Sequence, residues 1–219
     1  KEPDIKVERR LKAVAGETGD IDIAAEFETM KNKKIIYEAS SEDVCLVETD
    51  EEPPHELNKK ALETVLKVVL LLNAKIVDEI QVMRKTVVDG SNVSGFQRTA
   101  LVAMDGSIDT SLGKVRIPTI CIEEEAAQKI EEDKDFVRYR LDRLGIPLIE
   151  IGTAPDIKSA EQCKEVALFI GDVLRSCKVK RGIGTIRQDI NISIPSHPRV
   201  EIKGFQDVKM FIPVIKKEI

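Results

Sequence analysis

The stretch Ile186–Ile194, IRQDINISI, sorts its side chains into two faces when it is read with the two-residue period of a β-strand. One face is apolar apart from Gln188. The other face is polar and consists of Arg187, Asp189, Asn191 and Ser193. After a turn bounded by two prolines, the segment Arg199–Lys203, RVEIK, repeats the alternation. These two segments predict an antiparallel hairpin.

The polar faces of the two predicted strands should coincide if they pair. They would then gather cations, carboxylates and an amide on one surface, with Arg199, Glu201 and Lys203 from the second strand. A solvated outer face of a sheet has the same pattern. The sequence pattern therefore leaves both a ligand-binding surface and a plain outer surface open.

Two more predicted strands end on a glutamate where their apolar face should continue. These strands are Ile120–Glu124, ICIEE, and Ile146–Glu150, IPLIE. An ionised carboxylate on a core-facing stripe is costly unless a cation or a metal compensates it. Carboxylate oxygens suit Mg²⁺, which completes its shell with water and phosphate oxygens. The alternative is that each glutamate has already reached water at the end of its strand.

Other segments predict the scaffold around these strands. Apolar residues at helical spacing predict a helix over Leu57–Leu72, and Ser159 followed by Gln162 predicts the start of another over about 160–176. The loop Val87–Arg98, rich in Gly, Ser and Asn, should lead into a hairpin marked by Gly106 and Gly113. The segment Ile21–Phe27 alternates loosely, as a strand does, and the last residues look helical.

Composition excludes several classes of protein. The chain has 219 residues with a net charge of −5, and its longest aliphatic run, Val68–Leu72, is far below the roughly 20 residues that cross a bilayer. We expect a soluble, non-secreted protein with reduced thiols, because the four cysteines form no close pair. With no Trp and two Tyr, a nucleic-acid surface of stacked rings is not expected. A basic patch at Lys178–Arg181 could contact phosphates or could satisfy a helix C-terminus.

Common catalytic motifs are missing. His55 and His197 lack the spacing of a metal pair or a catalytic dyad, and there is no nucleophile elbow, Walker motif or dinucleotide-binding glycine pattern.

Six collinear blocks resemble the GatB/GatE family, most closely its archaeal GatE branch. They are Cys45–Leu62, Asp89–Thr99, Ile122–Ala127, Leu141–Ile157, Lys178–Ser193 and Arg199–Gln206. The resemblance implies an α+β fold, a mainly antiparallel sheet flanked by helices, in a cradle related to glutamine synthetase. It further implies that residues 1–219 are the catalytic core of a subunit that uses ATP to phosphorylate the glutamyl side chain of Glu-tRNA(Gln) and amidates it with ammonia.

The resemblance also implies roles for individual residues. Glu124 and Glu150 match the family's Mg²⁺ carboxylates and, with Arg187 and Lys203, are the candidate catalytic residues. The candidate ATP-binding residues are Arg84, Lys85, Arg187, Asp189, Asn191 and Glu201. The implied partners are the ammonia-producing subunit GatD, in a cytoplasmic heterotetramer, and the charged tRNA, with no membrane and no DNA.

Three departures from the family pattern stand out. The family's first strand, Gly-Leu-Glu-x-His, and its C-terminal insert and tail have no counterpart in this sequence. Cys45 matches only the last position of a zinc-like cysteine set, so the resemblance implies no zinc on this chain. Two alternatives remain: a glutamine-synthetase-like enzyme acting on a free amino acid, and a non-catalytic scaffold that binds a partner subunit or RNA.

Overall fold

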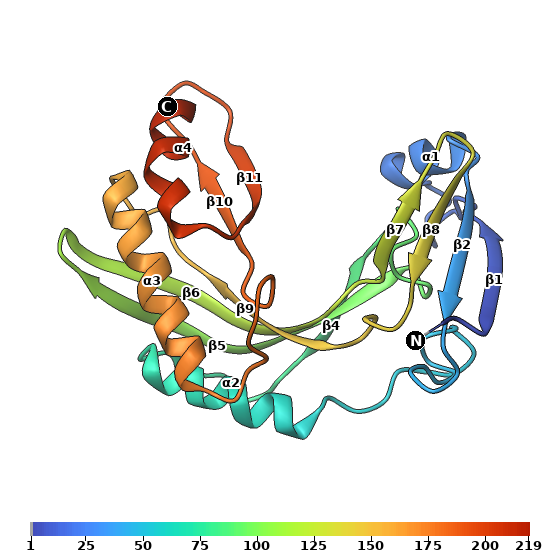
Figure 1. Ribbon diagram of the computed structural model, residues 1–219, viewed down its shortest axis with the longest axis horizontal. Helices are drawn as coiled ribbons and strands as arrows, with labels where there is room; N and C mark the ends of the chain where they lie inside the picture. Colours follow the sequence, from blue (N-terminus) through green and yellow to red (C-terminus); the bar gives the residue numbers. More distant parts are fainter. Residues whose placement is uncertain (1) are drawn as a thin grey trace. The chain divides into compact units, whose positions relative to one another are not determined.

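A computed structural model describes residues 2–219 (Figure 1). The fold is α+β with mainly antiparallel strands, as predicted. The chain divides into two compact units. The first contains the described residues up to Asn58, together with Gln81–Ala100 and Ile122–Ile149; the second contains Lys59–Ile80, Leu101–Cys121 and Glu150–Ile219.

The first unit is built on a four-stranded sheet. Its strands, in spatial order, are β1 (Ile5–Arg10), β2 (Lys34–Ala39), β8 (Phe136–Arg140) and β7 (Gln128–Glu132). The pairs β1–β2 and β7–β8 are antiparallel, whereas β2 and β8, about 100 residues apart in the sequence, run parallel. The core side chains of this sheet include Ile35, Tyr37, Val137, Tyr139 and Leu141.

The predicted strand at Ile21–Phe27 is wrong, because a helix, α1 (Ile23–Met30), begins there. The Asp22 side chain accepts a hydrogen bond of 2.9 Å from the backbone N–H of Ala25 and so caps the helix. The cap and the strong helix formers Ala24, Ala25 and Glu26 outweigh the loose alternation. None of the eight helical residues is buried, so no buried face favours the two-residue period of a strand here.

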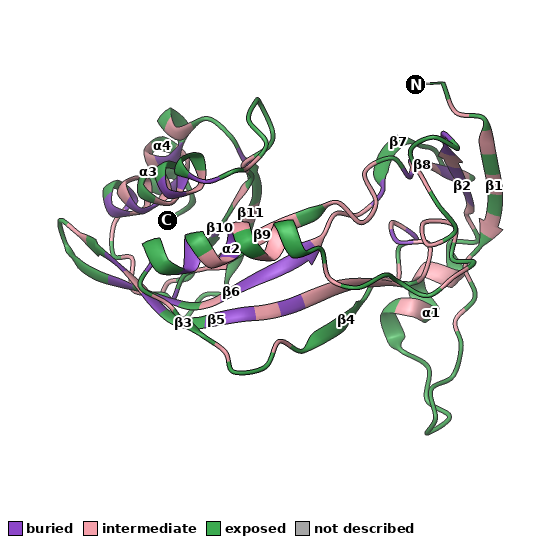
Figure 2. Cartoon of the chain, turned by 90° about the horizontal axis from the view of Figure 1, so that it is seen from below, coloured by how far each residue is buried: buried purple, intermediate pink, exposed green. Residues whose placement is uncertain are grey.

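A long hairpin supplies strands to both units. Its strands are β5 (Phe96–Thr110) and β6 (Gly113–Glu124), and the sheet is completed by β3 (Lys75–Ile76), β4 (Val82–Thr86) and β9 (Pro147–Gly152). Figure 2 shows the buried residues along β5 and β6. The hairpin predicted from Gly106 and Gly113 is confirmed. A Cβ at position 106 would lie 2.9 Å from the carbonyl oxygen of Leu72, so the close approach there requires glycine.

The second unit places helices against the predicted hairpin. Its elements are α2 (Lys59–Leu71), α3 (Ala160–Ser176), β10 (Gln188–Ile192), β11 (Val200–Phe205), the short helix η1 (Val208–Met210) and α4 (Phe211–Glu218). Ile190 and Phe205 of the hairpin pack with Phe211 and Ile215 of α4 in one apolar cluster. Both predicted long helices are confirmed, and the last residues are helical, as expected.

The start of α3 follows the predicted cap. The Ser159 hydroxyl accepts a hydrogen bond from the backbone N–H of Gln162, and the Gln162 side chain accepts one from the backbone of Lys158. Gln162 is 2% exposed and donates to the Thr110 hydroxyl at 3.0 Å. Gln162 thus also fixes α3 to the end of β5. Within residues 2–219, no helix combines the length and the apolar character that a membrane span requires.

Candidate active site

The candidate metal ligand Glu124, the last residue of β6, is held by an arginine from the neighbouring strand. Arg98 of β5 donates from Nε to Glu124 Oε1 at 2.8 Å, and its Nη2 contacts the same oxygen. Both side chains are about one-fifth exposed. The cation that a carboxylate on a core-facing stripe needs is therefore supplied by the protein itself, and the contacts to Oε1 leave Oε2 as a possible ligand.

The preceding residue, Glu123, was not predicted from the sequence. It is only 9% exposed, and its Oε1 accepts hydrogen bonds from Lys85 Nζ at 3.0 Å and from the Thr99 hydroxyl at 3.2 Å. Successive residues of a strand face opposite sides, so Glu123 and Glu124 lie on different faces of β6. The signal that could have revealed Glu123 is that the run ICIEE ends in two adjacent glutamates. Adjacent residues of a strand lie on opposite faces, so a buried strand end of this kind needs a cation on each face.

The predicted basic pair lies on β4, which pairs with β5. Arg84 stands opposite Arg98 and Lys85 opposite Gln97. The Arg84 guanidinium lies 5.3 Å from the centre of the Phe96 ring. Residues directly opposite on paired strands share a face. Arg84, Arg98 and Glu124 therefore share a face with one excess positive charge, which suits an anion such as a phosphate.

Glu150, the second predicted metal ligand, is exposed on β9 and falls in the second unit, whereas Glu124 falls in the first. Its neighbours Ile149 and Ile151 are both half-buried, so β9 does not alternate as the sequence suggested. Of the two interpretations that the sequence left open for Glu150, the structure supports the second, because the end of this strand has already reached water.

The predicted polar face of the hairpin is confirmed. Asn191 on β10 stands opposite Glu201 on β11, and both are exposed, whereas Ile190 is buried. A register shift between Gln188 and Ile190 lets Asp189 Oδ1 accept a hydrogen bond of 2.9 Å from the backbone N–H of Gly204. The bulge therefore turns one carboxylate toward the neighbouring strand.

Two cations complete this polar face. Lys203 Nζ lies 3.5 Å from Glu201 Oε2. Arg187 directly precedes β10 and is exposed, in step with the alternation of the strand. The structure thus brings together, within the second unit, the five candidate residues Arg187, Asp189, Asn191, Glu201 and Lys203. The exposure of this polar face fits a binding surface and a solvated outer face alike.

The basic patch at Lys178–Arg181 makes at least one helix-terminal contact. Arg181 donates to the backbone carbonyl of Arg175 in the last turn of α3. A cation there satisfies a carbonyl at the helix C-terminus. This contact supports the structural interpretation of Arg181, and the three other patch residues are exposed or half-buried.

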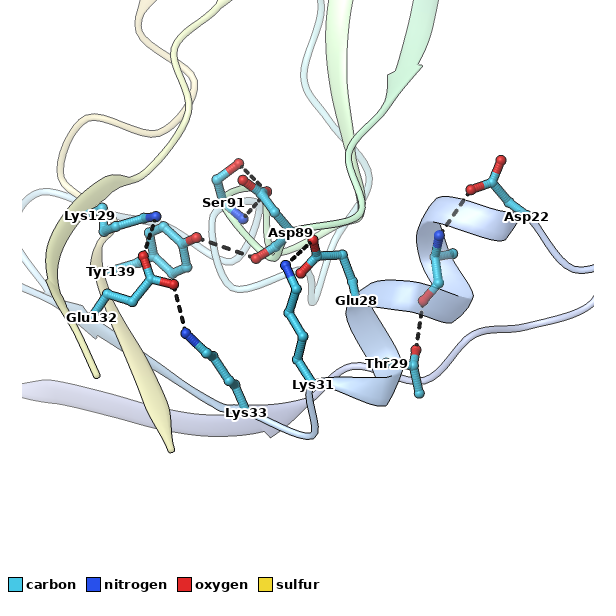
Figure 3. A network of polar contacts seen from close by, with 11 residues as sticks. Asp22, Glu28, Thr29, Lys31, Lys33, Asp89, Ser91, Lys129, Glu132 and Tyr139 are labelled. Atoms are coloured by element: carbon cyan, nitrogen blue, oxygen red, sulfur yellow. Dashed lines mark hydrogen bonds and ion pairs between the residues drawn. The ribbon is translucent and has the colours of Figure 1, made fainter. Parts of the chain in front are cut away.

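A further polar cluster in the first unit has no counterpart in the sequence pattern (Figure 3). Glu132 of β7 accepts hydrogen bonds from Lys129 at 2.7 Å and from Lys33 at 2.8 Å. The two ammonium groups, Lys129 first, lower the pKa of Glu132 to about 2. These side chains line a cavity of about 210 Å³. The parallel pairing of β2 with β8 brings Lys33 here, and periodicity within one strand carries no signal for that pairing.

Beside this cluster, two tyrosines hold the predicted glycine-rich loop. The Tyr37 hydroxyl donates to the carbonyl oxygen of Gly90 at 2.7 Å, and the Tyr139 hydroxyl donates to that of Asp89 at 3.3 Å. Burial raises the pKa of Tyr37 to about 12 and also raises the pKa of Tyr139. In the structure this loop is therefore held by core residues, and Figure 3 shows the Tyr139 hydroxyl joined to Asp89, which in turn contacts Ser91.

Comparison with known proteins places the chain in a family. The sequence model of the GatB/GatE catalytic domain matches residues 20–219. A protein of Thermococcus gammatolerans, named as the E subunit of glutamyl-tRNA(Gln) amidotransferase, is 55% identical over 217 residues, which are 99% of this chain and 35% of that protein. Proteins of the same name from Methanocaldococcus jannaschii, 53% identical over 219 residues, and Methanosarcina acetivorans, 56% identical over 217, are covered to 35% and 34% of their lengths.

This chain thus spans about a third of the length of these curated relatives. The match nevertheless runs over nearly all of the chain and includes every candidate site residue. The chain belongs to the GatB/GatE catalytic domain family.

Proposed function

We propose that this chain is the catalytic cradle core of a tRNA-dependent amidotransferase subunit. The observation that carries the proposal is the family match over residues 20–219, together with relatives of at least 53% identity that are each named as the E subunit of glutamyl-tRNA(Gln) amidotransferase. The proposed reaction phosphorylates the glutamyl side chain of Glu-tRNA(Gln) with ATP. Ammonia from a partner subunit of the GatD type then displaces phosphate and gives Gln-tRNA(Gln).

Glu124 and Glu150 are each proposed as a Mg²⁺ ligand because of the chemistry of their carboxylates. Glu124 keeps Oε2 available beside the contacts that Arg98 makes to Oε1, and Glu150 is exposed. Hard carboxylate oxygens are the donors that Mg²⁺ prefers. When bound, Mg²⁺ would neutralise charge on the phosphates of ATP. Arg98 fixes the orientation of Glu124, so this ligand would be pre-positioned.

The cations of the chain suit phosphoryl transfer, which depends mainly on positioning and on stabilising developing negative charge. Arg84 and Lys85 on β4 are proposed to contact the nucleotide. Arg187 and Lys203 are proposed to face the transferred phosphoryl group, and Glu201, which lies 3.5 Å from Lys203, would orient it. Asp189 and Asn191 would contribute polar contacts to the same ligand.

The decisive experiment is amidation of Glu-tRNA(Gln) by the complete enzyme with ammonium as the donor. Product that requires both ATP and tRNA supports the proposal. Product from free glutamate without tRNA would instead identify a glutamine-synthetase-like enzyme. Unchanged ATP-dependent amidation in a Glu150→Gln variant would contradict the metal assignment while leaving the reaction intact.

A non-catalytic scaffold is the second candidate, and one observation favours it. The Arg98–Glu124 pair gives Glu124 a structural partner without any metal. Calorimetric titration with a non-hydrolysable ATP analogue, with and without Mg²⁺, separates the two functions. Mg²⁺-dependent binding that is lost in Glu124→Ala favours the enzyme, and absence of nucleotide binding favours the scaffold.

A further inference from the structure

A trio of different metal-binding side chains meets in the loop between β2 and α2. The Cys45 thiol, a carboxylate oxygen of Glu52 and a ring nitrogen of His55 all lie within 4.8 Å of one another. His55 Nε2 lies 2.9 Å from Glu52 Oε1. The three residues span eleven positions of an acidic, proline-containing segment, so a turn of the chain, and not a short motif, brings them together.

The backbone of this loop is fixed by hydrogen bonds that do not involve the trio's ligand atoms. The N–H of Glu51 donates to the carbonyl of Leu46 at 2.8 Å, and Arg9 donates to the carbonyl of Thr49 at 3.1 Å. The backbone N–H of Cys45 donates to the Glu48 carboxylate at 2.7 Å. The loop is therefore folded before any ligand binds, which lowers the entropic cost of bringing the three side chains to one ion.

The backbone at His55, the last of the three residues in the sequence, is also anchored. Arg98 Nη1 donates to the backbone carbonyl of His55, while the other guanidinium nitrogens hold Glu124. Glu124 belongs to the same unit as the loop. The position of His55 is thus connected through one arginine to the candidate Mg²⁺ ligand.

The local charge favours a cation. Two carboxylates lie beside Cys45: Glu48 accepts a hydrogen bond from its backbone N–H, and a Glu52 oxygen lies within 4.8 Å of its sulfur. The negative potential of these carboxylates attracts a divalent cation, and a metal bound to the sulfur stabilises the thiolate.

We propose that Cys45, Glu52 and His55 form a binding site for a borderline-soft divalent cation of the zinc class. The Cys45 thiolate, a Glu52 oxygen and the neutral imidazole of His55 serve as ligands, and a water molecule completes a tetrahedral shell. One nitrogen, one sulfur and one oxygen donor are a combination that Zn²⁺ accepts, and three protein ligands leave one position open. Binding releases the thiol proton to solvent, so the coordinated sulfur carries the negative charge.

The proposal departs from two expectations. The resemblance implies no zinc on this chain because only one cysteine of a set is present, and His55 has no second histidine at metal-pair spacing. Both expectations rest on several residues of one type, cysteines or histidines, at a given spacing along the sequence. The folded loop instead combines three unlike donors. The site is independent of the proposed amidation, because it needs neither ATP nor tRNA.

The test is titration of the purified, metal-free protein with Co²⁺, followed by competition with Zn²⁺. We expect about one equivalent of bound Co²⁺, a thiolate-to-cobalt charge-transfer band and the visible bands of a tetrahedral ion, all displaced by Zn²⁺. The charge-transfer band should disappear in Cys45→Ser. Affinity should fall by about 100-fold or more in His55→Ala and Glu52→Gln, beyond the 10–100-fold typical of losing an outer-shell partner.

Each variant has a matched control within residues 2–219. Cys163→Ser, His197→Ala and Glu56→Gln remove the same chemical groups elsewhere and should leave the spectrum and the affinity unchanged. All three trio residues lie in an exposed or half-buried loop, so circular dichroism should show native folding in every variant. Failure to bind Co²⁺, or binding that survives Cys45→Ser or His55→Ala, would overturn the site whether or not the protein amidates tRNA.

Discussion

Arg98 and Glu124 are joined by two guanidinium contacts to one carboxylate oxygen, across the neighbouring strands β5 and β6. The pair is four-fifths buried, and the third guanidinium nitrogen holds the backbone of His55. A single arginine therefore orients the candidate Mg²⁺ ligand and anchors the loop that carries the proposed zinc-class site.

Removing this arginine should destabilise the fold. In Arg98→Ala, Glu124 is left as a largely buried carboxylate without its cation, and we expect a loss of about 1–3 kcal/mol in the free energy of unfolding. Urea unfolding measures the loss. Arg175→Ala, which breaks the exposed pair with Asp172, is the control and should change stability by less than about 0.5 kcal/mol. The double variant Arg98→Ala/Glu124→Gln should regain part of the loss; no recovery would show that the charge on Glu124 is not the cause.

The hairpin cation Arg187 should matter for activity more than for stability. Because Arg187 is exposed, Arg187→Ala should unfold at the same urea concentration as the parent protein. If it faces the transferred phosphoryl group, ATP-dependent amidation should fall by about 10²–10³-fold, the range seen when one transition-state donor is lost. Arg116→Ala, an exposed arginine on β6 in the same unit, is the matched control. Equal activity in the two variants would contradict the role proposed for Arg187.

The two lysines beside Glu132 should set its ionisation. Nuclear magnetic resonance titration of the carboxyl should give a pKa of about 2, and Lys129→Met should raise this pKa more than Lys33→Met does. The folded-state pKa lies below the ordinary value of 4.5, so the stabilisation is fully present above about pH 4.5 and is lost as the pH falls toward 2. Since the side chain is 44% exposed, salt should weaken the effect. An unshifted pKa in the parent protein would refute the ion-pair geometry.

Burial of Tyr37 should delay its ionisation. A spectrophotometric titration should show a tyrosine that ionises near pH 12, and this signal should be missing in Tyr37→Phe. A folded-state pKa above the ordinary value of 10 means that its contribution to stability is complete below about pH 10 and is lost as the pH rises toward 12. Tyr37→Phe should also cost about 1–2 kcal/mol at neutral pH, because the buried carbonyl of Gly90 loses its donor. Ionisation of every tyrosine near pH 10 would contradict the observed burial.

Gly90 and Gly95 provide a matched test of packing in the loop that the tyrosines hold. Both have positive φ, 84° and 79°, so alanine strains the backbone at either position by about 1 kcal/mol. A Cβ at Gly90 would lie 2.3 Å from Ile35 Cδ1, whereas a Cβ at Gly95 meets no atom within 4 Å. Thermal unfolding should show Gly90→Ala to be less stable than Gly95→Ala by about 1–3 kcal/mol, the cost of overpacking. Equal stabilities would mean that Ile35 moves aside freely.

Local patterns in the sequence determined much of the fold. The two-residue period of IRQDINISI predicted the hairpin and its exposed polar face, because a strand has only two faces and an apolar one must be buried. Helical spacing predicted α2, and Ser159 with Gln162 predicted the start of α3, because a cap satisfies backbone groups within one turn. The family membership of the chain was likewise evident from collinear motifs.

Only the tertiary structure decided which charges meet. Arg98 reaches Glu124 across a strand pair, Lys33 reaches Glu132 through the parallel pairing of β2 with β8, and a folded loop collects Cys45, Glu52 and His55. In each case the partners lie between 3 and 99 positions apart, and no period along the chain marks them. The same limit left the burial of Glu150 open, since whether a strand end reaches water depends on what packs over it. Periodicity records which face of an element is buried, whereas the contacts between elements fix the chemistry.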